Sequence, residues 1–166
     1  MEVTKDKLPS GLAYPCSIKD VREWLRALPQ EDVRGLVRVH LTNRRLWHFQ
    51  DGEYIGWQKK VVLSYAVDGD LIREFPTKWL PAEDVVSEWR AFGAEALRRS
   101  GRWCARWKSA AMLKRYIRFV LFHEIGHKVW ARMKRPARSG GEARAKEEEF
   151  CDSYARGHLD AVPSEG

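Results

Sequence analysis

The chain has 166 residues, of which 44% are hydrophobic, and a formal net charge of +7. This length favours one compact domain, residues 1–166, with enough apolar side chains for a core. The first residues lack the apolar segment of a signal peptide and no apolar run is long enough to span a membrane, so we expect neither. The three cysteines form no Cys-x-x-Cys pair and fit free thiols in a reducing cytoplasm. These are Cys16, Cys104 and Cys151.

The positive charge is concentrated in the second half of the chain. Such clusters favour acidic partners, including nucleic acid, although a solvated basic face explains them equally well. Trp103 and Trp107 lie within the first cluster, where they could stack on bases or anchor a loop to the core. The clustered basic residues are Arg98, Arg99, Arg102, Arg106, Lys108, Lys114, Arg115, Arg118, Lys128, Arg132, Lys134, Arg135, Arg138, Arg144 and Lys146.

The N-terminal part is predicted to contain an irregular arm followed by a helix. Residues 1–15 are rich in proline and glycine, which favours irregular structure. Ser17 is a typical helix N-cap, and Asp20 stands three residues later in the acidic position of the first turn. An apolar stripe continues from there until Pro29, which is expected to end the helix.

A small sheet is predicted in the next part of the chain. Alternating, β-rich residues predict strands at residues 36–41 and 60–67, and a further short strand is predicted at residues 47–49. The connections are short and contain turn residues such as Asp-Gly. We therefore expect a small, mostly antiparallel sheet over residues 36–75.

Helices are predicted to follow this sheet. A first-turn proline, acidic residues near the start and basic residues near the end predict a helix over residues 81–99. A longer helix is predicted at residues 107–131 and a last one at residues 142–159, before a tail at residues 160–166. The predicted fold class is α+β, with the sheet packed on the last two helices.

The sequence His123-Glu124-Ile125-Gly126-His127 lies inside the longest predicted helix. Residues four apart lie on one helical face, so the two histidines can bind the same ion, and Glu124 stays close enough to reach a water. Two imidazoles suit zinc, and the adjacent carboxylate suits a general base for hydrolysis. Without partners, two buried histidines and a buried glutamate would be costly. The pattern therefore favours a metal site over a chance helix.

Three downstream patterns could supply a third metal ligand. The metzincin pattern requires Gly and then His after the second histidine, where Trp130 and Met133 stand here. His158 is the remaining distant histidine, but it lies about 15 Å along a helix from Glu148. The third option is Glu148 itself, although consecutive glutamates are often only a solvated face. Asp152 follows four residues later on the same face and would fix the tautomer of a ligand histidine.

The His-Glu-x-x-His motif followed by Glu-x-x-x-Asp on a later helix resembles the gluzincin metallopeptidases, and more narrowly the minimal gluzincins and ImmA/IrrE-like peptidases. The resemblance rests on residues 123–127 and 148–155, and it implies a zincin-like fold, Zn²⁺ and hydrolysis of a protein substrate such as a regulatory protein. It also implies an edge strand that binds the extended substrate by strand addition. We assign this strand to Val61, Val62, Leu63, Ser64 and Tyr65.

In the resulting hypothesis Glu124 is the general base of a zinc metalloendopeptidase, and a further donor must stabilise the oxyanion. Tyr65, Tyr154 and His158 are the unranked candidates for this donor. The N-terminal arm could fill the cleft as a propeptide. The alternative function is a basic, tryptophan-rich nucleic-acid-binding or protein-interaction module with a structural or degenerate zinc site.

Overall fold

A computed structural model of the chain describes four segments, namely residues 1–43, 51–75, 81–133 and 141–160. The strand predicted at residues 47–49 lies outside them, as does all of the predicted tail except Asp160. The described elements, in chain order, are β1 (Glu2–Lys5), α1 (Ile18–Ala27), α2 (Gln30–Val33), β2 (Arg38–Thr42), β3 (Gly52–Ile55), η1 (Gly56–Gln58), β4 (Lys60–Ser64), β5 (Ile72–Glu74), α3 (Glu83–Ala91), β6 (Ala94–Arg99), β7 (Arg102–Trp107), α4 (Ala110–Met133) and α5 (Gly141–Leu159).

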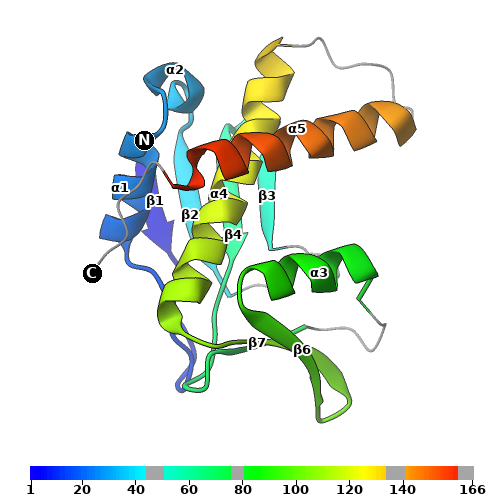
Figure 1. Cartoon of the computed structure of the whole chain (residues 1–166). Coiled ribbons are helices and arrows are strands. Elements are labelled where there is room, and N and C mark those ends of the chain that lie inside the picture. The colour runs from blue at the N-terminus through cyan, green and yellow to red at the C-terminus, as the bar shows by residue number, and fades with distance from the viewer. Residues whose placement is uncertain (44–50, 76–80, 134–140, 161–166) are drawn as a thin grey trace.

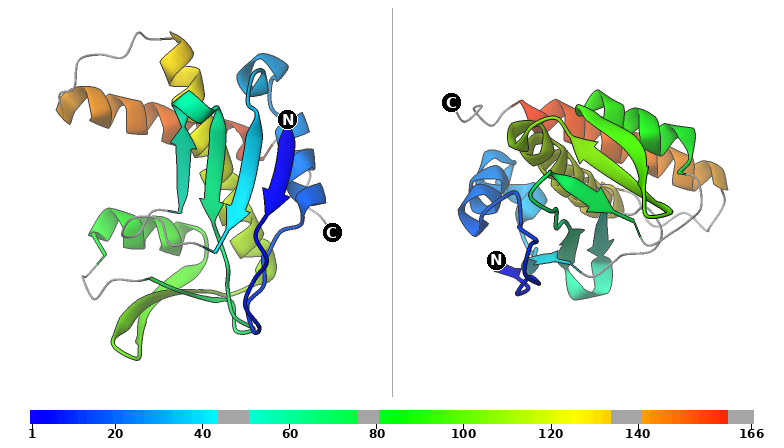
Figure 2. Two further views of the ribbon diagram at one scale, coloured as in Figure 1. Left: turned by 180° about the vertical axis from the view of Figure 1, so that it is seen from behind. Right: turned by 90° about the horizontal axis from the view of Figure 1, so that it is seen from below.

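The fold is α+β, as predicted, with α4 at its centre (Figure 1). A four-stranded sheet with the order β1-β2-β4-β3 covers one side of α4, and α5 crosses the other side (Figure 2). A separate three-stranded sheet, ordered β5-β7-β6, lies beyond the N-terminal end of α4. None of the described helices is long and apolar enough to cross a membrane.

The prediction of a mostly antiparallel sheet over residues 36–75 is wrong for the larger sheet. β2 pairs in parallel with both β1 and β4, and only β3 and β4 pair antiparallel. The prediction of an irregular arm is wrong for residues 2–5, because these residues form the strand β1. Parallel neighbouring strands need a crossover connection. The connection between β1 and β2 contains α1, and the connection between β2 and β4 contains β3.

The helix predicted over residues 81–99 is only half correct. The helix α3 ends at Ala91, and Gly93 follows it with a φ of 77°, a left-handed conformation typical of a helix end. The chain then forms the hairpin of β6 and β7, in which Ser100 and Gly101 both have positive φ. That pair of conformations suits a two-residue turn joining antiparallel strands. The next helix consequently begins at Ala110, three residues later than predicted.

Helix α1 forms as the sequence predicts. The Ser17 hydroxyl accepts a hydrogen bond from the backbone N–H of Asp20, and the Asp20 carboxylate accepts one from the backbone N–H of Ser17. This reciprocal capping satisfies two backbone donors that have no partner within the helix.

Helix α4 is buried on nearly every side, which fixes the direction of its functional face. Leu121 and Phe122 are 0% exposed, and burial of each such side chain contributes about 1.5–3 kcal/mol. Tyr116 packs edge-on against Tyr65 with ring centroids 5.8 Å apart, which joins α4 to the end of β4. A helix held this firmly can present its polar residues in one fixed orientation.

Candidate metal centre

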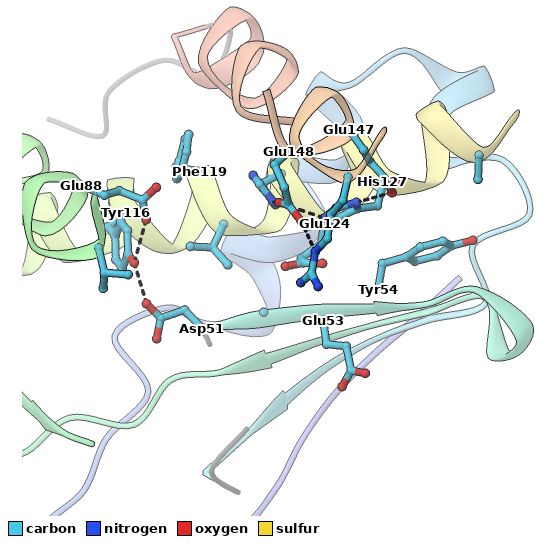
Figure 3. A pocket seen from close by; sticks show the side chains of 16 residues that line it. Asp51, Glu53, Tyr54, Glu88, Tyr116, Phe119, Glu124, His127, Glu147 and Glu148 are labelled. Carbon is cyan, nitrogen blue, oxygen red and sulfur yellow. Dashed lines mark hydrogen bonds and ion pairs between the residues drawn. The ribbon is translucent and has the colours of Figure 1, made fainter. Parts of the chain in front are cut away.

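The two motif histidines face α5 from adjacent turns of α4, with ring centroids 5.0 Å apart. The Nε2 atoms of His123 and His127 lie 3.2 and 3.7 Å from the same atom, Oε2 of Glu148 on α5 (Figure 3). Two imidazole nitrogens and one carboxylate oxygen thus converge on one point. The structure brings together the three residues for which the sequence suggested a shared ion.

The opposite ring nitrogens are held by two other carboxylates of α5. Nδ1 of His123 lies 2.9 Å from Oδ1 of Asp152, and Nδ1 of His127 lies 2.8 Å from Oε1 of Glu147. A carboxylate at Nδ1 favours a proton there and leaves Nε2 free to coordinate a metal. Asp152 stands where sequence reasoning put it, whereas the role of Glu147 was missed. The sequence did offer a way to find Glu147, because each ligand histidine needs an acceptor for its second ring N–H and Asp152 can serve only one of the two histidines.

The charge of this cluster depends strongly on its carboxylates. Burial disfavours the imidazolium of His123, but the hydrogen bonds to Asp152 and Glu148 outweigh burial and raise the pKa of His123 to about 10. The hydrogen bond with His123 in turn lowers the pKa of Glu148. In the metal-free imidazolium Nε2 of His123 also carries a proton, directed at Glu148, and a metal ion must displace that proton to bind.

His123, His127 and Cys151 also form a group that could hold a metal ion, since one donor atom of each lies within 4.8 Å of the others. The third ligand therefore has two candidates, Cys151 and Glu148. Cys151 is 0% exposed, and its Sγ would lie only 3.3 Å from a Cβ at Gly126, so it is packed between α4 and α5. Burial and nearby carboxylates raise the pKa of the Cys151 thiol, which opposes the thiolate that metals require. We favour Glu148 because its carboxylate is ionised and already lies between both Nε2 atoms.

Glu124 lies beneath β3 and is almost fully buried, with 7% of its surface exposed. The backbone N–H of Tyr54 donates a hydrogen bond to its carboxylate. Burial raises the pKa of Glu124, and the positive charges of His123 and His127 oppose this shift. A carboxylate held by strand β3 and made more basic by burial is suited to accept a proton from water.

The residues around this centre line an open cavity of about 500 Å³ between β3, α3, α4 and α5. Its β-strand wall is β3, which is the outer strand of the sheet within the described residues. The prediction that Val61–Tyr65 form the edge strand is therefore wrong, because β4 is paired with β2 on one side and β3 on the other. The misassigned residues are Val61, Val62, Leu63, Ser64 and Tyr65.

The three oxyanion donors suggested by the sequence are not among the described residues that line this cavity. Tyr65 is 0% exposed beneath the sheet. The Tyr154 hydroxyl donates to Oδ2 of Asp32 on α2, 2.8 Å away, and His158 packs against the ring of Tyr154. Tyr154 and His158 lie six and ten residues beyond Glu148 on α5, and a helix of 3.6 residues per turn directs them away from its face.

The N-terminal strand lies far from this centre. β1 occupies the edge of the sheet opposite β3, and its residues are not part of the cavity lining. Residues 2–5 therefore do not fill the cleft as a propeptide would.

The basic residues nearest Trp103 and Trp107 lie on the hairpin of β6 and β7, whereas Lys114, Arg115 and Arg118 lie on α4. Arg99 and Arg106 form ion pairs with Asp68 and Glu95, which offset part of the positive charge. Trp107 is only 2% exposed, so it anchors the hairpin to the core and is not available to stack on bases. A nucleic-acid partner stays a prediction, and these ion pairs leave the hairpin with less positive charge than its basic residues alone suggest.

No family model, no curated protein and no solved structure matches this chain.

Gly126 sets the distance between the two helices that carry the centre. A Cβ at this position would lie 2.9 Å from the Cα of Cys151, so α5 would have to move away from α4. We expect Gly126→Ala to weaken metal binding at least tenfold and to lower the free energy of unfolding by about 1–3 kcal/mol. Metal competition titrations and denaturant unfolding measure these two quantities.

The matched control is Gly157→Ala, a helical glycine of α5, where an added Cβ meets nothing within 4 Å. It should leave metal affinity unchanged and stabilise the helix slightly. Equal metal affinity in Gly126→Ala and the parent protein would show that close helix packing does not position the ligands.

Proposed function

We propose that this chain is a zinc-dependent metallopeptidase of the gluzincin type with a zincin-like fold. The observation that supports this proposal most strongly is the convergence of His123 Nε2, His127 Nε2 and Glu148 Oε2, with the other ring nitrogens held by Asp152 and Glu147. Orientation of both imidazoles by carboxylates is a common feature of zinc sites.

The donor set fits zinc better than it fits magnesium or calcium. Two neutral imidazoles and one carboxylate are frequent ligands of Zn²⁺ in catalytic sites, whereas magnesium and calcium prefer oxygen ligands only. His123, His127 and Glu148 would hold the ion. Zn²⁺ supplies Lewis acidity, which makes water a stronger acid and a peptide carbonyl a better electrophile.

The protein's own residues account for the remaining requirements. Glu124 accepts the proton of the attacking water and later delivers it to the leaving amine. The backbone N–H of Tyr54 keeps this carboxylate in one orientation. Within the part of the chain that the structure describes, β3 is an edge strand beside the cavity, so it could offer backbone groups to an extended peptide that adds to the sheet as a further strand.

The third ligand provides the test of this proposal. We expect Glu148→Gln to lose most of its bound zinc and its hydrolysis of unfolded protein, because an amide is a weaker ligand than a carboxylate. Cys151→Ala should keep both, because the thiol lies between the helices. Metal analysis of each purified protein and cleavage of a denatured protein substrate are the measurements.

Loss of zinc in Cys151→Ala with retention in Glu148→Gln would reassign the ligand and remove the gluzincin pattern. A parent protein that binds zinc stoichiometrically but cleaves no unfolded protein or peptide would contradict the peptidase function.

A further inference from the structure

Glu88 lines the cavity but is neither a proposed metal ligand, nor an acceptor for a ligand histidine, nor the proposed base. Glu88 on α3 lies beside Tyr116 near Asp51 at one end of this cavity, and it also lines an adjoining hollow with residues of α5 (Figure 3). We propose that Glu88 selects peptide substrates that place a positively charged nitrogen group in this end of the cleft. This inference rests on the proposed peptidase function and names its substrate class.

The hydrogen bonds at this end of the cavity do not provide a proton donor for both Asp51 and Glu88. The hydroxyl oxygen of Tyr116 lies 2.6 Å from Oδ2 of Asp51 and 3.1 Å from Oε1 of Glu88. A phenol has a single proton and can donate to only one of the two carboxylates at a time. The shorter contact identifies Asp51 as the acceptor, so Glu88 needs a donor from elsewhere.

Asp51 is already neutralised and does not compete for a substrate cation. It forms an ion pair with Arg73, and the side chains of the two residues are 6% and 8% exposed. The Arg73 guanidinium also lies over the ring of the buried Tyr65, 4.5 Å from its centroid, and this contact holds the guanidinium inside the protein. Glu88, by contrast, forms no ion pair within the described residues, and it faces the cavity.

The other cations near Glu88 are engaged by the acids of α5. Arg156 lies 4.0 Å from Asp152 and places its guanidinium over the ring of Phe119. Arg144 lies 3.8 Å from Glu148. Positive charge therefore lies near Glu88, but none of the described residues forms an ion pair with it.

The walls around Glu88 suit the stem of a basic side chain. Val85, Phe119 and Val120 line the same cavity, and the half-buried Val85 exposes the most surface of the three. Lysine and arginine bury their methylene groups on apolar surface and extend their charge beyond it. An apolar wall that ends in a carboxylate matches this shape, whereas an acidic substrate would meet like charge.

The pKa of Glu88 is consistent with a site that binds a cation. Burial, followed by the negative charges of Asp152 and Asp51, raises the pKa of Glu88 to about 7. A bound ammonium or guanidinium favours the ionised carboxylate and removes this shift.

The test compares peptides that differ only in lysine and its uncharged analogue norleucine, with acetylated amino termini. We expect the parent protein to cleave the lysine peptide with a kcat/KM about tenfold higher at one position, since Glu88 is partly exposed. Glu88→Gln should lose this preference while cleaving the norleucine peptide at nearly the parent rate. Glu83→Gln is the control, because Glu83 lies on the same helix with its side chain 78% exposed.

Peptides with free amino termini separate the two sources of the cation. A preference that depends on Glu88 but occurs only with a free amino terminus identifies the terminal amine as the group recognised. Equal cleavage of all four peptides, that is, of the lysine and norleucine peptides with free and with acetylated amino termini, would overturn the proposal. An unchanged preference in a folded Glu88→Gln protein would also overturn it, and Glu88→Ala, which likewise removes the carboxylate, replaces that variant if the glutamine form does not fold.

Binding of the same peptides to a Glu124→Gln protein separates this proposal from the peptidase function. A lysine preference in binding that disappears on adding Glu88→Gln supports the role of Glu88 even if no cleavage occurs. Equal binding of both peptides contradicts it.

Discussion

Glu124→Gln is expected to lower kcat/KM for peptide hydrolysis by about 10²–10⁴-fold while leaving zinc content and fold unchanged. The glutamine amide has the same shape and can still accept the hydrogen bond from the Tyr54 backbone N–H, but it cannot accept a proton from water. Because Glu124 is not one of the converging ligands, the metal should stay bound. Peptide cleavage rates, metal analysis and circular dichroism together test these expectations.

Glu53→Gln is the matched control for this substitution. Glu53 also lines the cavity but is exposed on β3, on the strand next to Tyr54. It should retain the parent rate within a few-fold. If Glu124→Gln cleaves peptides as fast as the parent protein, Glu124 is not the general base and the mechanism is wrong.

The second large effect is expected at Gly52, where β3 passes directly over the general base. A Cβ at this position would lie 2.8 Å from Cγ and Oε1 of Glu124 and 2.8 Å from Cγ1 of Val120. In Gly52→Ala the strand or the carboxylate must move, so the base leaves its position and the peptide-binding edge shifts. We expect hydrolysis to fall by about 10²-fold, since small displacements of reacting groups have effects of this size.

The zinc content of Gly52→Ala should stay at the parent level, because the ligand histidines face α5 and not β3. The control is Gly56→Ala, just beyond the same strand, where a Cβ would meet only Cε1 of Tyr54 at 3.6 Å. That variant should be nearly as active as the parent protein. Parent-like activity in Gly52→Ala would mean that β3 does not position the base as described.

Local patterns predicted the parts of this protein that depend on local interactions. The Ser17 cap, the last helix and the histidine helix follow from side-chain spacing and capping chemistry, which act within a few residues. The placement of Glu148 and Asp152 against the histidines also follows from spacing, because each pair lies on one helical face. Gly126 was visible in the motif, but its function in bringing the helices together requires the neighbouring Cys151 backbone.

The errors at β1 and at the sheet edge concern pairing between distant segments, whereas the error over residues 81–99 concerns the local hairpin of β6 and β7. Strand order decides which strand is the edge, and nothing in residues 52–55 indicates that they pair outside β4. The short β1 depends on pairing with β2, so local composition alone suggested an irregular arm. In the same way, Glu88 reads as one exposed position of an amphipathic helix until the fold places it beside Tyr116.

We propose that His123, His127 and Glu148 hold a zinc ion next to Glu124. Anomalous diffraction at the zinc absorption edge, from crystals of the protein purified with zinc, tests this claim most directly. We predict one strong peak bonded to Nε2 of both histidines and to the carboxylate of Glu148. A peak bonded to Sγ of Cys151 without Glu148, or no peak at this position, would contradict the account.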